Sequence, residues 1–65
     1  MSNAEHLIEN VILAMAEKRD PYEELEWRGN QMMLDETGIR KDDLVAMAVH
    51  VVYSLYDGVF PDFPD

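Results

Sequence analysis

The chain has 65 residues and no cysteine, and its 14 acidic residues outnumber its 5 basic residues, which gives a net charge of −9. A chain of this length buries only about 60% of the surface that its unfolded form exposes, and without cysteine neither disulfides nor thiolate zinc sites can support its small core. Its acidic surface repels phosphate backbones, so direct binding of nucleic acid is not expected.

The first predicted helix covers residues 4–18. Its apolar residues recur at spacings of three and four, which places them on one face that packs against the core. These residues are Leu7, Ile8, Val11, Ile12 and Met15. Residues 1–3 are expected to be disordered or derived from an expression tag, with at most a capping role for Ser2 or Asn3.

The second predicted helix covers residues 21–36 and carries the sharpest start signal in the sequence. Asp20 is a favoured N-cap residue, and Pro21 suits the first helical position. Glu23 stands three residues after Asp20 and completes a capping box. Beyond the helix, Gly38 is of the type that helices prefer as a C-cap.

Three residues of this second helix bear on contacts with other elements. Gly29 lies on the apolar side, and because a glycine inside a helix costs up to about 1 kcal/mol relative to alanine, we expect another helix to approach closely there. Trp27 and Leu34 fall on nearly the opposite side. The indole either lies across the helix surface or, because tryptophan is enriched at binding hot spots, forms a partner-binding surface with Leu34.

The third predicted helix begins at residue 41 or 42 and ends at residue 56 or 57. Its apolar residues cover an arc well above the ~100° that a one-sided helix needs. The thin polar line between them consists of Asp43, His50, Ser54 and Asp57.

We expect two short helices of one chain to be unable to cover this arc, so that a second copy packs against it. The predicted dimer interface consists of Leu44, Met47, Ala48, Val51, Val52 and Leu55. The sequence thus predicts an all-α fold, in which a short helical hairpin or three-helix chain assembles as a homodimeric helical bundle.

The helical domain is expected to span residues 4–58, and residues 59–65 are expected to form an extended acidic-aromatic tail. Prolines in this tail remove backbone donors and prevent a helix. Phe60 and Phe63 are candidate partner-binding residues. The alternatives are that Phe60 folds back onto the hairpin and that Phe63 belongs to a frayed end.

The sequence contains no motif for catalysis, a cofactor or a metal ion, so no such residues are predicted and the chain is not expected to be an enzyme. His50 and Ser54 lie one turn apart and could touch, but a solvent-facing polar line accounts for both more simply. No apolar run reaches the ~20 residues of a membrane span, and no signal peptide is recognised. A cytoplasmic protein without membrane contact is therefore expected.

Residues 19–58 read RDPYEELEWRGNQMMLDETGIRKDDLVAMAVHVVYSLYDG. This block, with the small size and the acidity, resembles the small early proteins encoded in the exo–xis region of lambdoid phages, and the resemblance spans roughly residues 5–60. The resemblance implies a non-enzymatic helical accessory protein, made early in infection in the bacterial cytoplasm. Such a protein acts through contacts with a host or phage protein and modulates host or phage physiology, including the choice between lysis and lysogeny. It assigns no residue roles.

Two other functions are compatible with the sequence. An acidic DNA mimic would inhibit a nucleic-acid-binding host protein, but the acids are spread around all three predicted helices and mixed with Arg28, Arg40 and Lys41. A helix-turn-helix DNA-binding protein would need basic and amide side chains on its recognition helix, and the third helix has almost none. A homodimeric adaptor that binds another protein is therefore preferred.

Overall fold

A computed structural model describes residues 2–57, except for the side chain of Tyr56. This part of the chain contains four α-helices and no β-strand. The helices are α1 (Asn3–Ala16), α2 (Pro21–Leu25), α3 (Arg28–Thr37) and α4 (Lys41–Tyr56). The predicted all-α fold is confirmed, although three helices were predicted. The predicted tail, with Phe60 and Phe63, lies outside the described residues.

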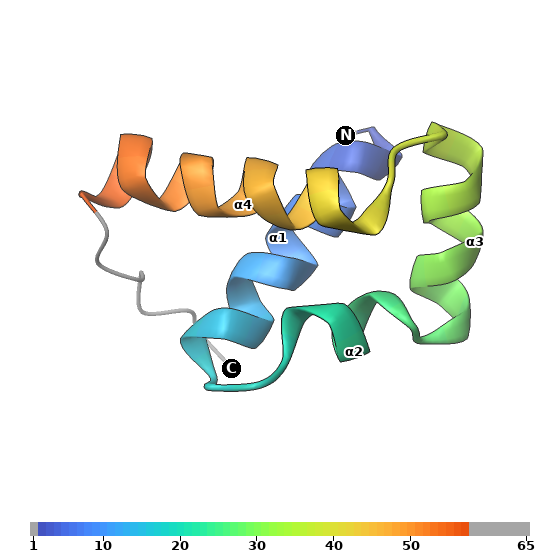
Figure 1. The fold of residues 1–65 in the computed structure, drawn as a ribbon, viewed down its shortest axis with the longest axis horizontal. Helices are drawn as coiled ribbons and strands as arrows, with labels where there is room; N and C mark the ends of the chain where they lie inside the picture. Colours follow the sequence, from blue (N-terminus) through green and yellow to red (C-terminus); the bar gives the residue numbers. More distant parts are fainter. Residues whose placement is uncertain (1, 58–65) are drawn as a thin grey trace.

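The four helices enclose one small core, with α1 as the central helix. In Figure 1, α4 and α2 lie along opposite sides of the molecule and α3 connects their ends, while α1 runs diagonally between them. Because α1 contacts each of the other three helices, it closes the core. The buried apolar residues come from all four helices and are Leu7, Val11, Ile12, Ala14, Leu25, Leu34, Leu44, Ala48 and Val52.

The first helix is fixed at its start by Ser2. The Ser2 hydroxyl accepts a hydrogen bond from the backbone N–H of Glu5 at 3.2 Å, which satisfies one of the free donors of the first turn. The helix therefore begins at Asn3, one residue earlier than predicted. Ser2 thus has the capping role that was allowed for it, and Asn3 is the first helical residue, within the segment expected to be disordered or derived from a tag.

The end of α1 is a Schellman motif built around Lys18. This residue has a left-handed backbone (φ 64°), and its N–H donates to the carbonyl of Met15 at 3.1 Å. The N–H of Arg19 donates to the carbonyl of Ala14 at 2.8 Å. These two bonds satisfy carbonyls that have no partner within the helix, so α1 stops at Ala16 and the chain turns towards α2.

The predicted N-cap and first residue of α2 are confirmed, whereas the hydrogen bonds among residues 2–57 include none of the predicted capping box with Glu23. Asp20 is the N-cap, and its Oδ1 accepts a hydrogen bond from the N–H of Tyr22 at 2.9 Å. Pro21 occupies the first helical position, where its missing N–H leaves no bond unmade.

The prediction of one continuous helix over residues 21–36 is wrong, because the chain breaks at Glu26 and Trp27 and restarts as α3. The expected close approach at Gly29 is also wrong. Gly29 is exposed, and an added Cβ would meet no atom of residues 2–57 within 4 Å. The predicted C-cap is confirmed, since Gly38 has φ 71° and donates its N–H to the carbonyl of Leu34 at 3.1 Å.

The chain covers much more of α4 than was predicted, because both α1 and α2 pack against it. Leu44, Ala48 and Val52 are buried in the chain's own core. Their assignment to a dimer interface is therefore wrong. The polar line of α4 is exposed along its whole length, as predicted.

Candidate protein-binding surfaces

Trp27 is the single tryptophan of the chain, and 66% of its surface is exposed. It lies at the break between α2 and α3, with extended backbone (φ −61°, ψ 139°), and it occupies the N-cap position of α3. An indole has no oxygen to accept a hydrogen bond from the first turn, so helix capping does not explain a tryptophan here. The position of Trp27 follows instead from the hydrogen bonds that hold the break between α2 and α3.

The break is held by Asn30, which is buried although it is polar. Its Nδ2 donates to the backbone carbonyl of Glu24 at 2.6 Å and to Oε2 of the same residue at 2.9 Å. Its Oδ1 accepts from Nδ2 of Asn10, in α1, at 3.0 Å. Carbonyls in the last turn of a helix lack partners within the helix. Asn30 satisfies one of them, and this stabilises the point at which α2 stops and α3 turns away.

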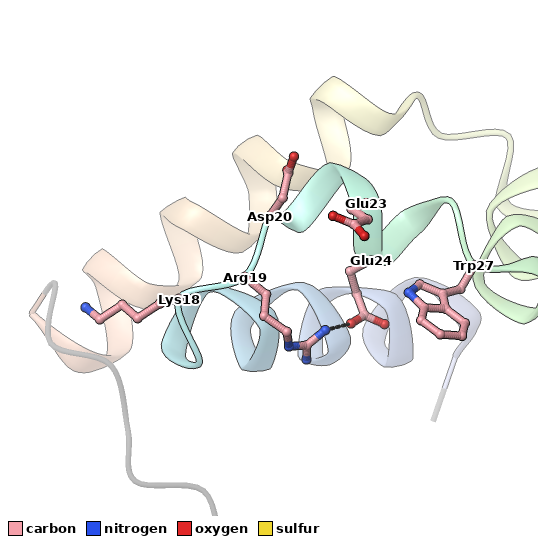
Figure 2. A pocket seen from close by; sticks show the side chains of 6 residues that line it. All are labelled: Lys18, Arg19, Asp20, Glu23, Glu24 and Trp27. Carbon is pink, nitrogen blue, oxygen red and sulfur yellow. Dashed lines mark hydrogen bonds and ion pairs between the residues drawn. The ribbon is translucent and has the colours of Figure 1, made fainter.

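The carboxylate of Glu24 is held from its other side by Arg19 (Figure 2). Nη1 of Arg19 lies 2.5 Å from Oε1 of Glu24, and Nη2 lies 2.6 Å from Oε1 of Glu17. The hydrogen bonds with Glu24 and then Glu17 raise the pKa of Arg19 above its ordinary value. Glu24 is thus fixed between the turn before α2 and the helix after it, beside Trp27.

Two surface pockets meet at Trp27. The first has a volume of about 390 Å³ and is lined by Lys18, Arg19, Asp20, Glu23, Glu24 and Trp27. The second has a volume of about 350 Å³ and is lined by Glu23, Glu26, Trp27 and Arg28. Most of these walls are charged side chains, whereas small-molecule sites are lined mainly by apolar ones. The pockets therefore suit side chains of a partner protein.

Positive and negative side chains are more evenly balanced on the surface around Trp27 than in the chain as a whole. Three of the five basic residues, Lys18, Arg19 and Arg28, line the two pockets. A fourth, Lys41, lies 3.7 Å from a carboxylate oxygen of Glu26. Tryptophan and arginine are the residue types most enriched at binding hot spots, so this is the surface best suited to a protein partner.

Leu34 does not join Trp27 at this surface. Its side chain is only 7% exposed and packs in the core. The prediction that both residues form one partner-binding surface is therefore wrong. The reason is the break between α2 and α3. The prediction assumed one continuous helix from Trp27 to Leu34, but α3 is a new helix that begins at Arg28, so the angle between the two side chains cannot be counted at 100° per residue.

Two rows of apolar residues remain on α4, because residues four apart follow one another along a helix surface. The first row is Met47, Val51 and Leu55, the three predicted interface residues that the core does not bury. The second row is Val45, Val49 and Tyr53. Leu55 and Tyr53, at 71% and 67%, are the most exposed large apolar residues among residues 2–57.

Leu55 is exposed although it points in nearly the same direction as Leu44, which lies about three turns before it. Figure 1 shows the reason, since the last turns of α4 extend beyond the place where α1 crosses it. The fold therefore leaves the end of α4 without a covering helix from residues 2–57.

Neither a metal site nor a membrane-spanning helix is found in the part of the chain that the structure describes. Among residues 2–57, no group of three or more His, Cys, Asp or Glu could hold a metal ion. His50 and Ser54 are both exposed. Within the same residues, no helix has the length and apolar character needed to cross a membrane.

Sequence reasoning missed Asn30 and its partner Asn10. A signal was present, because Trp27, Gly29 and Asn30 are all weaker helix formers than Ala, Leu or Glu and stand close together in the predicted helix. That signal marks a weak segment but does not name the partner that stabilises a break.

The surface around Trp27 and the two rows on α4 are the features of this fold that suggest a function. Comparison of the chain with protein-family models, with curated proteins and with solved structures finds no match. The resemblance of residues 19–58 to early proteins of the exo–xis region therefore stays a prediction.

Proposed function

We propose that the chain is a non-enzymatic accessory protein that acts by binding another protein, with Trp27 at the centre of the binding surface. The observation that carries this proposal is the exposure of Trp27 beside a buried polar network that fixes the backbone around it. A pre-organised aromatic side chain loses little conformational freedom on binding, and an indole contributes a large contact area.

The resemblance of residues 19–58 supplies the setting of this proposal. The partner is a host or phage protein in the cytoplasm of a bacterial host. Binding takes place early in infection and modulates host or phage physiology, including the choice between lysis and lysogeny. The mixed charges around Trp27 support a protein partner over a nucleic acid, because a phosphate backbone would meet Glu23 and Glu26 there.

The experiment that tests the role of Trp27 is capture of partners from bacterial lysate by three immobilised chains. These are the wild type, Trp27→Ala, and Met32→Ala as the matched control, since Met32 is also a largely exposed apolar residue near the break. A protein captured by the wild type and the control should be lost from Trp27→Ala, with at least a tenfold drop, or about 1.4 kcal/mol.

Thermal melting separates this result from unfolding. Trp27 packs little against its own chain, so Trp27→Ala should melt close to the wild type. Equal capture by all three chains would contradict the proposal. A large fall in melting temperature would instead place Trp27 in the structural core.

We also propose that two copies of the chain associate through Met47, Val51 and Leu55. A small core gains from a partner subunit, and apolar residues at spacings of four form the ridges by which helices pack together. Sedimentation at micromolar concentration should give twice the chain mass, and Leu55→Asp should reduce it to the mass of one chain without unfolding. A wild-type chain that sediments as a compact monomer would contradict this assembly.

The acidic DNA mimic gains no specific support. Glu17 and Glu24 form ion pairs with Arg19, and Glu26 pairs with Lys41. These three carboxylates are thus partly neutralised, whereas a DNA mimic presents its carboxylates to the partner's cations.

A further inference from the structure

One side of α4 carries a stripe of five exposed residues, which we name the Tyr53 stripe. Its members are Asp42, Ala46, Val49, Tyr53 and Asp57. Spacings of four, three, four and four residues keep them on one side of a helix, so they form a straight line along its length. The middle of the line is apolar, and each end is a carboxylate.

This stripe is separate from the other two surfaces. The polar line through His50 and Ser54 lies between it and the row that contains Met47 and Leu55. Tyr22 of α2 extends the Tyr53 stripe at the Asp42 end. The Tyr22 ring is 41% exposed, and hydrogen bonding to the Asp42 carboxylate raises the pKa of its hydroxyl.

The charge of this region has one sign. The chain contains no lysine or arginine after Lys41, and Lys41, the first residue of α4, pairs with Glu26 of the turn after α2, so no basic residue belongs to the stripe. Asp57 is also unfavourable for folding, because it stands at the negative end of the α4 dipole with a left-handed backbone (φ 53°). Glycine or asparagine is the usual residue there, so stability of the helix does not explain this aspartate.

We propose that the Tyr53 stripe binds a basic amphipathic helix of another protein. Such a helix has about four turns, and its apolar side chains cover Val49 and Tyr53. Lysine or arginine residues near its two ends pair with Asp42 and Asp57, which lie about 22 Å apart along α4. A lysine or arginine side chain that pairs with Asp42 also lies near the aromatic ring of Tyr22.

Charge complementarity selects this occupant over a second copy of the chain. Two Tyr53 stripes placed face to face bring carboxylate against carboxylate at both ends, whether the helices run parallel or antiparallel. Like charges placed opposite each other in an interface weaken binding. A basic helix turns the same two positions into attractive contacts while covering the same apolar centre.

The probe for this proposal is a designed helical peptide of about four turns, with leucines on one face and lysines near both ends. A second peptide carries glutamates in place of the lysines. Calorimetric titration of the full chain should show binding of the lysine peptide and none of the glutamate peptide. Because any cationic peptide is attracted to a chain of net charge −9, the variants must show where it binds.

Tyr53→Ser should weaken binding of the lysine peptide by about tenfold, whereas Met32→Ser, at an exposed position of α3 outside the stripe, should leave it unchanged. Asp57→Asn should weaken it more than Glu9→Gln, which removes the same charge from the exposed side of α1. Melting curves check that all four variants fold.

Three outcomes would overturn the proposal. If the stripe variants and their controls weaken binding of the lysine peptide equally, the peptide is attracted by the overall negative charge and not by the Tyr53 stripe. Loss of the dimer in Tyr53→Ser, measured by sedimentation, would make a second copy the occupant. Tighter peptide binding after replacement of Phe60 and Phe63 by serine would mean that the chain's own last residues compete for the stripe. The capture experiment on Trp27 is independent of all three.

Discussion

The covered and the uncovered parts of α4 are similarly apolar but have different surroundings. Leu44, Ala48 and Val52 are buried in the core, while Tyr53 and Leu55 are more than two-thirds exposed. The difference does not come from the residue types. It comes from the position of α1 and α2, which cover one side of α4 and only part of its length.

This comparison shows that an apolar helix surface has two separate meanings. On the covered side, apolar residues stabilise the fold, and truncation leaves a cavity. On the uncovered side, the same residue types contribute little to folding and are available for binding another protein. The following substitutions test this division, from the largest expected effect on stability to the smallest.

Leu44→Ala should lower the free energy of unfolding by about 2–5 kcal/mol, because it opens a cavity in a small core. Leu55→Ala removes the same atoms from a position that is exposed in the single chain, and below the concentration at which two copies associate it should change this free energy by less than about 0.5 kcal/mol. Urea denaturation followed by circular dichroism measures both. Similar losses for the two variants would contradict the division of α4 into a part covered by the core and an uncovered end.

Asn30→Ala should lower the free energy of unfolding by about 1–3 kcal/mol, since it leaves the Asn10 amide without its partner and leaves the Glu24 carbonyl with only the 3.4 Å bond from the N–H of Trp27. Gln31→Ala, at the exposed neighbouring position, is the control and should have little effect. Because Trp27 is the single tryptophan, its fluorescence reports on the same break. An unchanged emission spectrum and stability in Asn30→Ala would mean that the break does not depend on this amide.

Gly29→Ala should raise the free energy of unfolding by up to about 1 kcal/mol. The added methyl group meets no atom within 4 Å among residues 2–57. Gly38→Ala should lower the free energy of unfolding, because the backbone angle φ of 71° at this position is strained for alanine. Thermal melting of the two variants gives the sign of each change, and a destabilised Gly29→Ala would restore the predicted close approach of another helix.

Tyr22 should show the smallest effect, confined to alkaline pH. Its pKa is raised by hydrogen bonding to Asp42 and then by desolvation, so its contribution to stability is complete below the ordinary tyrosine pKa of about 10 and is lost as pH rises through the higher folded value. Absorbance titration of tyrosinate should show one group moving to lower pH in Asp42→Asn. Identical titration curves for the wild type and Asp42→Asn would contradict the hydrogen bond between Tyr22 and Asp42.

Local signals in the sequence predicted the starts and ends of helices well. Asp20 and Pro21 begin α2, and Gly38 ends α3, because each acts through its own backbone or its immediate neighbours. The apolar face of α1 also follows from spacing alone, since Leu7, Val11 and Ile12 are in the core.

The features that were not predicted depend on contacts between distant residues. The break at Trp27 depends on Asn30 meeting Asn10, which belongs to another helix. The coverage of α4 depends on where α1 crosses it, and no periodicity within α4 contains that information. The position of Leu34 was wrong for the same reason, because an unseen break changed the helical phase.

The absence of lysine and arginine after Lys41 has a practical consequence for capturing a complex. Trypsin cannot cut α4 beyond Lys41, so a partner joined to the rest of this helix would remain attached to one long peptide in mass spectrometry. Reagents that couple two lysines reach this chain only through Lys18, Lys41 and its amino terminus. Carbodiimide activation of Asp42 or Asp57, in contrast, would join α4 directly to a lysine of the bound protein and mark both contact residues.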